Sequence, residues 1–406
     1  MALLKLILVF VGIVLLLSRR WNLGLVLLIA SVAIGLLFEY PLPAVGRDVL
    51  FTSVEQLTLR LALSIVLIMT MGELLRETAS LHGMVEALRV LIPSRRLVMA
   101  GLPALVGLLP MAGGAVFSAP MVDEVGDQIG VDQERKTFVN YWFRHIWEYV
   151  FPLYPSFMLA AALLNLETFQ LARVTWPLTV AAVLGGSVFG LMGIPRKPRE
   201  DPLPSARLDS VRILVISVWP VVLVIVLSLT LPIDEGVALI LSLLVTIALM
   251  VAMRGIPLRA LGHILYRRIP WKTVSVLFGA LIFRRVLESS GAVNAVSEAL
   301  TAVHVPVALV VFAIPFIAGW LTGLSVGAFS IGFPVVLPLV APDGASTSGW
   351  AAWLMAGGFL GVLCSPLHLC LSLTRAYFGA DWGPVYRRIA PSSLVVAVIA
   401  ALLLLS

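Results

Sequence analysis

The chain has 406 residues, of which 60% are hydrophobic and 12% are charged, and its mean hydropathy is +1.04. This composition excludes an ordinary soluble globular protein and is typical of a polytopic membrane protein. The net charge of +6 does not indicate nucleic-acid binding, because the basic residues lie in short loops between apolar segments. The cysteines, Cys364 and Cys370, share one apolar segment and show no metal-ligand spacing, so we expect neither a disulfide framework nor a metal site.

Apolar segments long enough to be membrane spans follow one another along the chain. In the first half, the predicted spans are residues 2–17, 22–38, 57–71 and 168–193, with a further helix from about Thr137. In the second half they are residues 211–230, 236–253 and 272–287, a helix from about Trp350 and a last span that ends at Leu405. The first span has no small-residue cleavage site, so we expect no cleavable signal.

One apolar stretch, GLLPMAGGAVFSAPMV at residues 107–122, is interrupted by prolines and glycines. The segment that leads into it, residues 97–109, would rise only ~20 Å as a helix, whereas the hydrocarbon core is ~30 Å thick. Acidic residues follow from Asp123 onward. We therefore predict a re-entrant hairpin that enters the bilayer and returns to the same side. Peptide groups in a non-helical tip must be buried in protein or line a wet cavity, so the tip is a candidate solute site.

A second interrupted stretch, GWLTGLSVGAFSIGFPVV at residues 319–336, repeats this pattern. Several identities fall at a constant offset of 212: Pro103 with Pro315, Gly107 with Gly319, Phe117 with Phe329, Ser118 with Ser330, and residues 86–88 with 298–300. A constant offset predicts an internal duplication. Paired interrupted segments in corresponding halves point to the binding site of a transporter.

The predicted fold is an all-α polytopic membrane protein with two inverted repeats, each of five membrane crossings plus one re-entrant helical hairpin. Five is odd, so the second half must enter the membrane from the opposite face. Arg and Lys gather on one predicted face, for example Arg20, Lys136, Lys272 and the cluster at residues 196–207, and the other face has little beyond Lys5 and Arg47. The positive-inside rule makes the first face cytoplasmic. We expect a multi-pass protein of the inner (cytoplasmic) membrane with both termini outside, the first hairpin opening inward and the second outward.

The predicted boundaries follow from this topology. Repeat 1 is residues 1–193 and repeat 2 is residues 211–406, joined by a polar cytoplasmic linker at residues 194–210. Within repeat 1 we assign scaffold helices to 1–75, the hairpin to 97–130, a broken helix to 137–165 and a last helix to 168–193; within repeat 2 the same parts are 211–288, 305–341, 349–378 and 388–405. An amphipathic stretch precedes each hairpin, at 78–92 and 289–303, and is predicted to lie along the membrane interface. An ordinary loop helix is the alternative for either stretch.

The segment NYWFRHIWEYVFPLYPS, residues 140–156, carries the charges of a predicted membrane helix. On a helix, Tyr141, His145 and Glu148 would share a face, and Arg144 and Glu148 would be an (i, i+4) pair. Ionisable groups within membrane spans tend to face the bundle interior. They could supply a counter-charge for an anionic substrate or a proton relay, or they could be a buried ion pair that only orients helices.

Helix breaks occur at related places in the two halves. Pro152 would break the first helix, and Ser365 and Pro366 would break the second. With a two-residue shift in offset, Pro152 corresponds to Pro366 and Tyr154 to His368. Each half therefore offers a hairpin tip and a broken helix, and interrupted helices that face one cavity bring together helix N-termini, which attract anions, and freed carbonyls, which can hold a cation.

We assign candidate roles on this basis. The predicted substrate- or ion-binding residues are Gly113, Gly114, Ser118, Pro152, Tyr154, Ser325, Gly327, Ser330, Ser365, Pro366 and His368. The predicted charge or proton-relay residues are Arg144, His145, Glu148 and Arg375. A packing role for His368 and a small-residue helix crossing for Gly113 and Gly114 are the structural alternatives. No catalytic residue, metal ligand or cofactor is predicted, apart from a bound sodium ion.

The paired hairpins, the broken helices, the interfacial helices and the inverted repeats together resemble the ion transporter superfamily of elevator-type secondary carriers. That superfamily includes dicarboxylate/sodium symporters, gluconate and lactate permeases, arsenite permeases and some sodium/proton antiporters. The segment RKTFVNYWFRHIWEYVFPLYPS, residues 135–156, is most similar to the integral membrane family called domain of unknown function 401. Dicarboxylate members carry a Ser-Asn-Thr triplet at each tip, and here the tips read GGAVFSAP and LSVGAFSIG, so dicarboxylate specificity does not carry over.

The resemblance implies a secondary active transporter, usually a homodimer, in which a domain that holds the substrate slides against a static scaffold. We expect the substrate to be a small, anionic solute and the driving force to be a sodium or proton gradient. A cation/proton antiporter without an organic substrate is the alternative, and His145 and Glu148 would suit it.

An intramembrane hydrolase is an alternative from another class, because His145 and Glu148 have H-x-x-E spacing, but the full H-E-x-x-H zinc motif does not occur. A structural or assembly protein would leave the duplicated tips unexplained.

Overall fold

The computed structural model describes residues 1–77, 80–108, 114–195, 204–292, 295, 306–340 and 348–405. It is all-helical, with 85% helix, 19 helices and no strand in this part of the chain. Five helices are long and apolar enough to cross a membrane: residues 56–77, 168–191, 207–230, 235–254 and 382–405. Many large apolar side chains on these helices are exposed, such as Val215 and Leu394. These observations confirm a helical membrane protein.

The helices of the first half follow the predicted spans closely. They are α1 (Ala2–Ser18), α2 (Leu23–Leu37), α3 (Leu42–Val54), α4 (Gln56–Glu77), α5 (Ser80–Leu91), α6 (Arg95–Gly107), α7 (Gly114–Gln128), α8 (Gln133–Arg144), the 3-10 helix η1 (Ile146–Tyr149), α9 (Pro155–Leu163), and α10 (Thr168–Gly186) with its π-helical end η2 (Ser187–Leu191). The side chains of Asn22 and Asp132 accept backbone hydrogen bonds at the start of α2 and α8, which fixes where these helices begin.

The described helices of the second half follow in chain order. They are α11 (Pro204–Thr230), α12 (Glu235–Arg254), α13 (Leu258–His263) with its π-helical end η3 (Ile264–Arg268), α14 (Trp271–Ser289), α16 (Val307–Thr322), α17 (Ser325–Val340), α18 (Ser348–Leu363), α19 (Leu369–Phe378) and α20 (Trp382–Leu405).

Two helices were not predicted, and two boundaries differ from those predicted. The short helices α3 and α13 were not predicted, because polar residues interrupt their apolar character. The linker was predicted to extend to residue 210, but α11 begins at Pro204, and the last helix begins at Trp382 rather than at 388. Gly113, residues 196–203 of the linker and most of the second amphipathic stretch lie outside the described residues.

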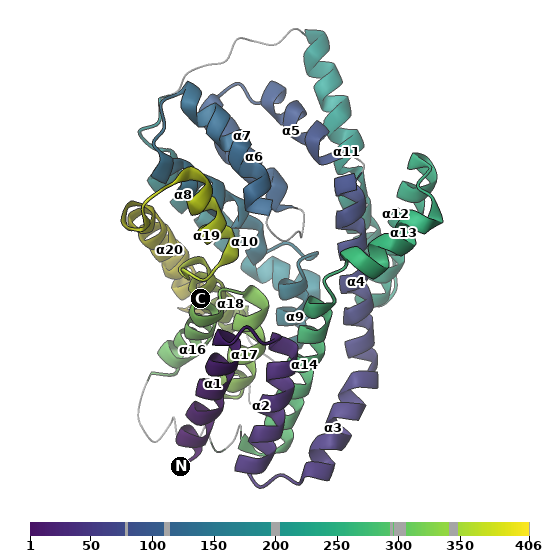
Figure 1. The fold of residues 1–406 in the computed structure, drawn as a ribbon, viewed down its shortest axis with the longest axis vertical. Coiled ribbons are helices and arrows are strands. Elements are labelled where there is room, and N and C mark those ends of the chain that lie inside the picture. The colour runs from purple at the N-terminus through teal and green to yellow at the C-terminus, as the bar shows by residue number, and fades with distance from the viewer. Residues whose placement is uncertain are drawn as a thin grey trace.

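The helices form two groups that each combine both halves of the chain. In one group, α2 packs on α14, α4 on α12 and α5 on α11, along the lower and right-hand side of Figure 1. In the other group, α6 packs with α7 and α8, α16 packs with α17 and α18, and α10 packs with α20, towards the left of Figure 1. The crossing of α2 and α14 needs glycine, since a Cβ on Gly279 would lie 2.6 Å from the carbonyl oxygen of Gly24.

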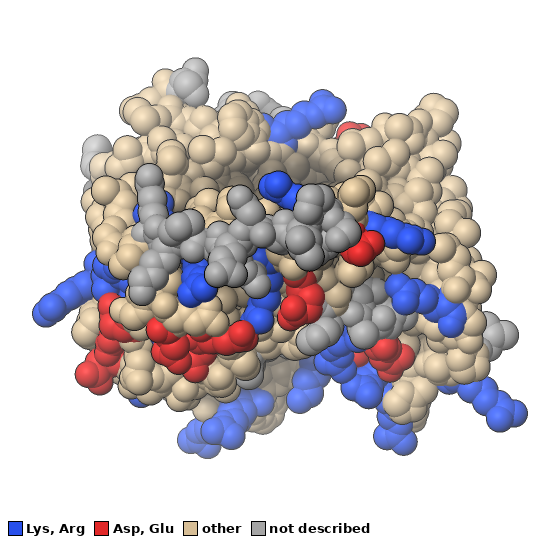
Figure 2. All heavy atoms as spheres, turned by 90° about the horizontal axis from the view of Figure 1, so that it is seen from above, with Lys and Arg blue, Asp and Glu red and all other residues tan. Residues whose placement is uncertain are grey.

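Charged side chains of both signs gather at one end of the molecule, the upper end in Figure 1, which Figure 2 shows from above. Lys136, in the first turn of α8, is buried, and its Nζ donates to Asp123 at 2.7 Å and to Asp127. This ion-pair network ties α8 to α7, so two of the acidic residues that follow the interrupted stretch hold a buried lysine.

Candidate functional site

The chain is irregular at two places where a helix is interrupted in the middle of the second group. In the first half, α8 ends at Arg144 and α9 begins at Pro155. In the second half, α18 ends at Leu363 and α19 begins at Leu369. The first break therefore starts earlier than the predicted Pro152, and His145 and Glu148 are not on a continuous α-helix. The predicted α-helical spacing was wrong there. The 3-10 helix η1 nevertheless places Glu148 near both Arg144 and His145.

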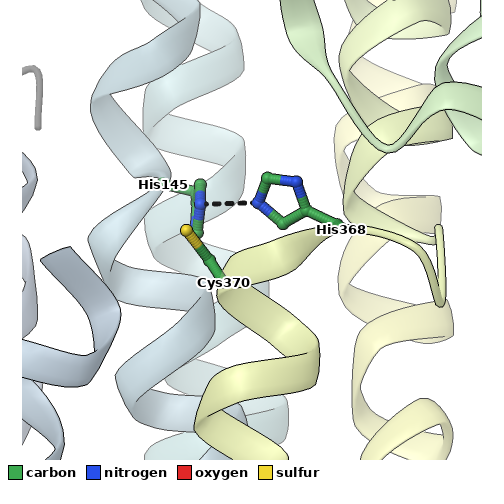
Figure 3. Close-up of side chains that lie close together, drawn as sticks. All are labelled: His145, His368 and Cys370. Carbon is green, nitrogen blue, oxygen red and sulfur yellow. Dashed lines mark hydrogen bonds between the residues drawn. The ribbon is translucent and has the colours of Figure 1, made fainter. Parts of the chain in front are cut away.

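His145 and His368 meet across these two breaks, as Figure 3 shows. Their Nε2 atoms lie 3.0 Å apart. The Nδ1 of His145 lies 2.6 Å from the carbonyl oxygen of Tyr141, and the Nδ1 of His368 lies 2.7 Å from that of Gly323. A carbonyl only accepts hydrogen bonds, so both Nδ1 atoms carry the proton. The Sγ of Cys370 completes a compact group whose three ligand atoms all lie within 4.8 Å of one another.

Arg144 and Glu148 lie beside this histidine pair and are both buried. The Nη1 of Arg144 is 3.4 Å from His145 Nε2 and 3.9 Å from Glu148 Oε1. Glu148 Oε2 accepts a hydrogen bond of 2.9 Å from the hydroxyl of Ser325, the first residue of α17. The predicted charge group therefore includes a contact between the two halves of the chain.

Gly114, the first residue of α7, lies directly against Arg144. A Cβ on Gly114 would lie 2.8 Å from Nε of the guanidinium. The first backbone N–H groups of a helix have no intrahelical partner and carry a partial positive charge. A buried guanidinium at a helix N-terminus concentrates positive charge and favours an anion nearby.

Each broken helix is tied to the C-terminal end of α6 or α16 in its own half by a side chain at the N-cap of its second part. The hydroxyl of Tyr154, the N-cap of α9, donates to the carbonyl oxygen of Gly107. His368, the N-cap of α19, bonds the carbonyl of Gly323 as described above. Ser365 adds a 2.6 Å hydrogen bond to the carbonyl of Trp320. These predicted residues therefore hold the site together.

Ser118 and Ser330 were predicted to lie at the hairpin tips, but both lie inside helices, beyond the first turn of α7 and α17. Ser118 donates a 2.6 Å hydrogen bond to Oδ1 of Asn140, which in turn donates to the carbonyl of Ala115 at 2.8 Å. Asn140 is fully buried and was not predicted. Its signal was an amide in an otherwise aromatic part of α8. Ser118 and Asn140 therefore have hydrogen-bond partners within the protein, and their hydrogen bonds hold α7 against α8.

The remaining predicted residues lie around the site rather than in it. Pro152 is buried within the first break, Pro366 is exposed, and Gly327 packs against Thr322. Arg375 lies in the last turn of α19, with its guanidinium 4.7 Å from the centre of the Trp382 ring. The structure does not bring Arg375 into contact with the histidine pair. Cys370 was missed because the two cysteines were considered only for spacing along the sequence.

A cavity of about 640 Å³ leads to this site from the boundary between the two helix groups. From the first group, it is lined by the end of α1, the start of α2 and the start of α14, including Arg20 and Lys272. From the second group, it is lined by the start of α9, by the junction of α16 and α17 with Ser325, and by His368. A volume of this size suits a small ligand.

The chain belongs to the family described as "Protein of unknown function (DUF401)", which matches residues 2–406. This confirms the family to which the segment at residues 135–156 was found most similar. No curated protein that was compared matches the chain.

Proposed function

Starting from membership of this uncharacterised family, we propose that the chain is a secondary active transporter that carries a small anion across the membrane, driven by a sodium or proton gradient. The observation that carries the proposal is the cavity, since residues of both helix groups line it and Ser325 and His368 are among them. A binding site at such a boundary can be exposed or closed by relative motion of the two groups.

The charges around the cavity favour an anion. Arg20 and Lys272 line it, and Arg144 lies buried beyond it next to the N-terminus of α7. Positive charge along the route raises the local concentration of an anionic solute. Glu148, bound to Ser325, supplies the carboxylate that a coupling proton or sodium ion needs.

Repeated contacts support the inverted duplication that the mechanism requires. In the first half, Gly107 of α6 packs against the carbonyl oxygen of Arg144, and Ala104 accepts a hydrogen bond from Trp147. In the second half, Gly319 packs against Gly358, and Phe316 packs against Gly361. Gly319 and Phe316 lie 212 positions after Gly107 and Ala104. Their partners Gly358 and Gly361 lie 214 positions after Arg144 and Trp147. Helix α2 packs on α14, and α12 packs on α4. If α12 is the repeat of α2 and α14 the repeat of α4, a pseudo-two-fold axis would relate these two pairs.

In the proposed mechanism, residues 1–75 and 211–288 form a scaffold that dimerises, and residues 97–193 and 305–406 form the moving transport domain. The positive-inside rule assigns Arg20 and Lys272 to the cytoplasm. The cavity would then open inward, with the junction of α16 and α17 reaching it from outside. Solute and cation bind beside Arg144 and Glu148, and the transport domain then slides until the same site faces outward.

The proposal is tested in two steps. The purified protein is first screened for thermal stabilisation by small organic and inorganic anions, in sodium and in potassium, because a ligand that binds the folded state raises the melting temperature. The stabilising anion is then followed into proteoliposomes with and without an imposed sodium or proton gradient. Gradient-driven accumulation supports the proposal. Cation exchange with no anion uptake would instead support the cation/proton antiporter.

A further inference from the structure

The histidine pair has an electrostatic problem that the proposed anion site does not solve. Both Nδ1 atoms donate to carbonyl oxygens, so in the neutral rings both Nε2 atoms present lone pairs, and these face each other at 3.0 Å. The Nη1 of Arg144, 3.4 Å from His145 Nε2, offsets part of the repulsion between these lone pairs, and a positive particle between the two nitrogens would remove it. A shared proton and a metal ion are the two particles that fit.

Cys370 distinguishes these two explanations. A shared proton needs only the two imidazoles, whereas the Sγ of Cys370 also lies here, within 4.8 Å of one ring nitrogen of each histidine (Figure 3). Two imidazole nitrogens and a thiolate are a donor set that selects Zn²⁺ or Cu⁺ over Mg²⁺, Ca²⁺ or Na⁺. A carbonyl hydrogen-bonded to Nδ1 is also the usual outer-shell arrangement of a metal-binding histidine, because it fixes the tautomer that leaves Nε2 free.

The spacing of the two nitrogens fits a tetrahedral ion. Metal–nitrogen bonds of about 2.0–2.1 Å at a tetrahedral angle place two nitrogens about 3.3 Å apart. The observed 3.0 Å between His145 and His368 therefore needs to widen by only a few tenths of an ångström. His368 reaches the 640 Å³ cavity, which gives an ion a route into this otherwise buried place.

We propose that His145, His368 and Cys370 bind a thiophilic cation, Zn²⁺ or Cu⁺, and leave its fourth coordination position for a ligand from the cavity. The neighbouring charges are compatible with this ion. Glu148 and the Cys370 thiolate are negative and Arg144 is positive, so one net negative charge balances Cu⁺, and with Zn²⁺ an anion in the fourth position completes the balance. This inference does not depend on the proposed transport function. If the protein bound one metal ion but transported no anion, the metal-site proposal would still hold.

Metal content and cobalt spectroscopy test the site. The full-length protein is purified in detergent through a tag that binds no metal and without chelator, and its zinc and copper are measured per chain. The chelator-stripped protein is then titrated with Zn²⁺, with Cu⁺ under reductant, with Co²⁺ and with Mg²⁺ as a control. We expect close to one Zn²⁺ or Cu⁺ per chain, a rise in melting temperature of about 3 °C at a hundredfold excess over the dissociation constant, and a thiolate-to-cobalt charge-transfer band.

Matched variants separate the site from general effects on folding. Cys370→Ser should lose the cobalt band and the stabilisation by metal, and Cys364→Ser should keep both, because Cys364 lies near Ser393 instead. His368→Gln should lose them while His263→Gln keeps them. If Cys370→Ser does not fold, protection of Cys370 from alkylation by Zn²⁺ or Cu⁺ in the otherwise native chain gives the same information. The proposal is overturned if the stripped wild-type protein binds none of Zn²⁺, Cu⁺ and Co²⁺ more tightly than Mg²⁺, or if Cys370→Ser retains the cobalt band.

Discussion

The two broken helices share a backbone plan but carry different chemistry. The first break, between α8 and α9, brings Arg144, His145 and Glu148 to the site. The second, between α18 and α19, is shorter and contributes His368 and Cys370, while Gly358 occupies the place that corresponds to Arg144. The comparison teaches that similar packing contacts can recur in both halves while the buried Arg144 and Glu148 come from the first half only. The site is therefore asymmetric in charge.

The largest effect is expected from removing the positive charge of Arg144, which has no counterpart in the second half. Arg144→Gln removes the buried guanidinium beside Gly114, and we expect uptake of the anion identified by the stabilisation screen to fall by about 100-fold or more, as for other lost partners of buried charge pairs. Arg375→Gln is the matched control, since Arg375 stacks on Trp382 away from the histidine pair, and should change uptake less than about threefold.

Proteoliposome uptake at a concentration well below saturation measures this difference, with size-exclusion profiles as a check that both variants fold. Equal losses in the two variants would show that the asymmetry of charge has no part in solute binding.

The second prediction sharpens what the halves have in common. Gly107 and Gly319 occupy equivalent places, and a Cβ at either would collide with a carbonyl oxygen of the facing helix. Gly107→Ala and Gly319→Ala should each reduce the free energy of unfolding by about 1–3 kcal/mol, the usual effect of overpacking. Gly72→Ala should not, because nothing lies within 4 Å of its added methyl group.

Thermal unfolding in detergent compares the three variants directly. A large loss for only one of the two equivalent glycines would mean that the repeated contacts do not reflect a repeated structural role.

The smallest expected effect concerns the hydrogen bond that joins the two halves at the site. Ser325→Ala removes the donor to Glu148 Oε2, and water from the cavity can replace it in part. We therefore expect the apparent affinity for the solute to fall about fivefold, which corresponds to ~1 kcal/mol. Ser18→Ala is the control, because Ser18 lines the same cavity but bonds its own helix at Leu15. A concentration series of uptake measures both; an unchanged affinity in Ser325→Ala would remove Ser325 from the binding site.

Much of the fold could be predicted because a membrane span is a long apolar segment whose ends are visible in the sequence. The short helices α3 and α13 could not be, because neither has continuous apolar character. Helix α3 packs on α2, α4 and α14, and α13 continues directly into η3. Helix spacing also gave the wrong account of residues 140–156: the α-helix ends at Arg144, and the 3-10 helix after it still places Glu148 near Arg144.

The site was predicted in part for a similar reason. Arg144, His145, Glu148 and His368 stood out as ionisable groups in apolar surroundings. Cys370 could not be connected with His145, which is 225 positions earlier, because only the meeting of the two breaks brings them together. Asn140 was missed since an amide in a helix gives no sign of its partner, and Ser118 showed its role only once its hydrogen bond to Asn140 was seen.

The most direct test of alternating access is the accessibility of the junction between α16 and α17 from each side of the membrane. Leu324→Cys in a Cys364→Ser background places a thiol on the cavity wall, and a membrane-impermeant maleimide is applied to right-side-out and to inside-out vesicles. The proposed mechanism predicts labelling from both faces, with a ratio that shifts when solute and coupling cation are added. Labelling from one face alone under every condition would contradict it.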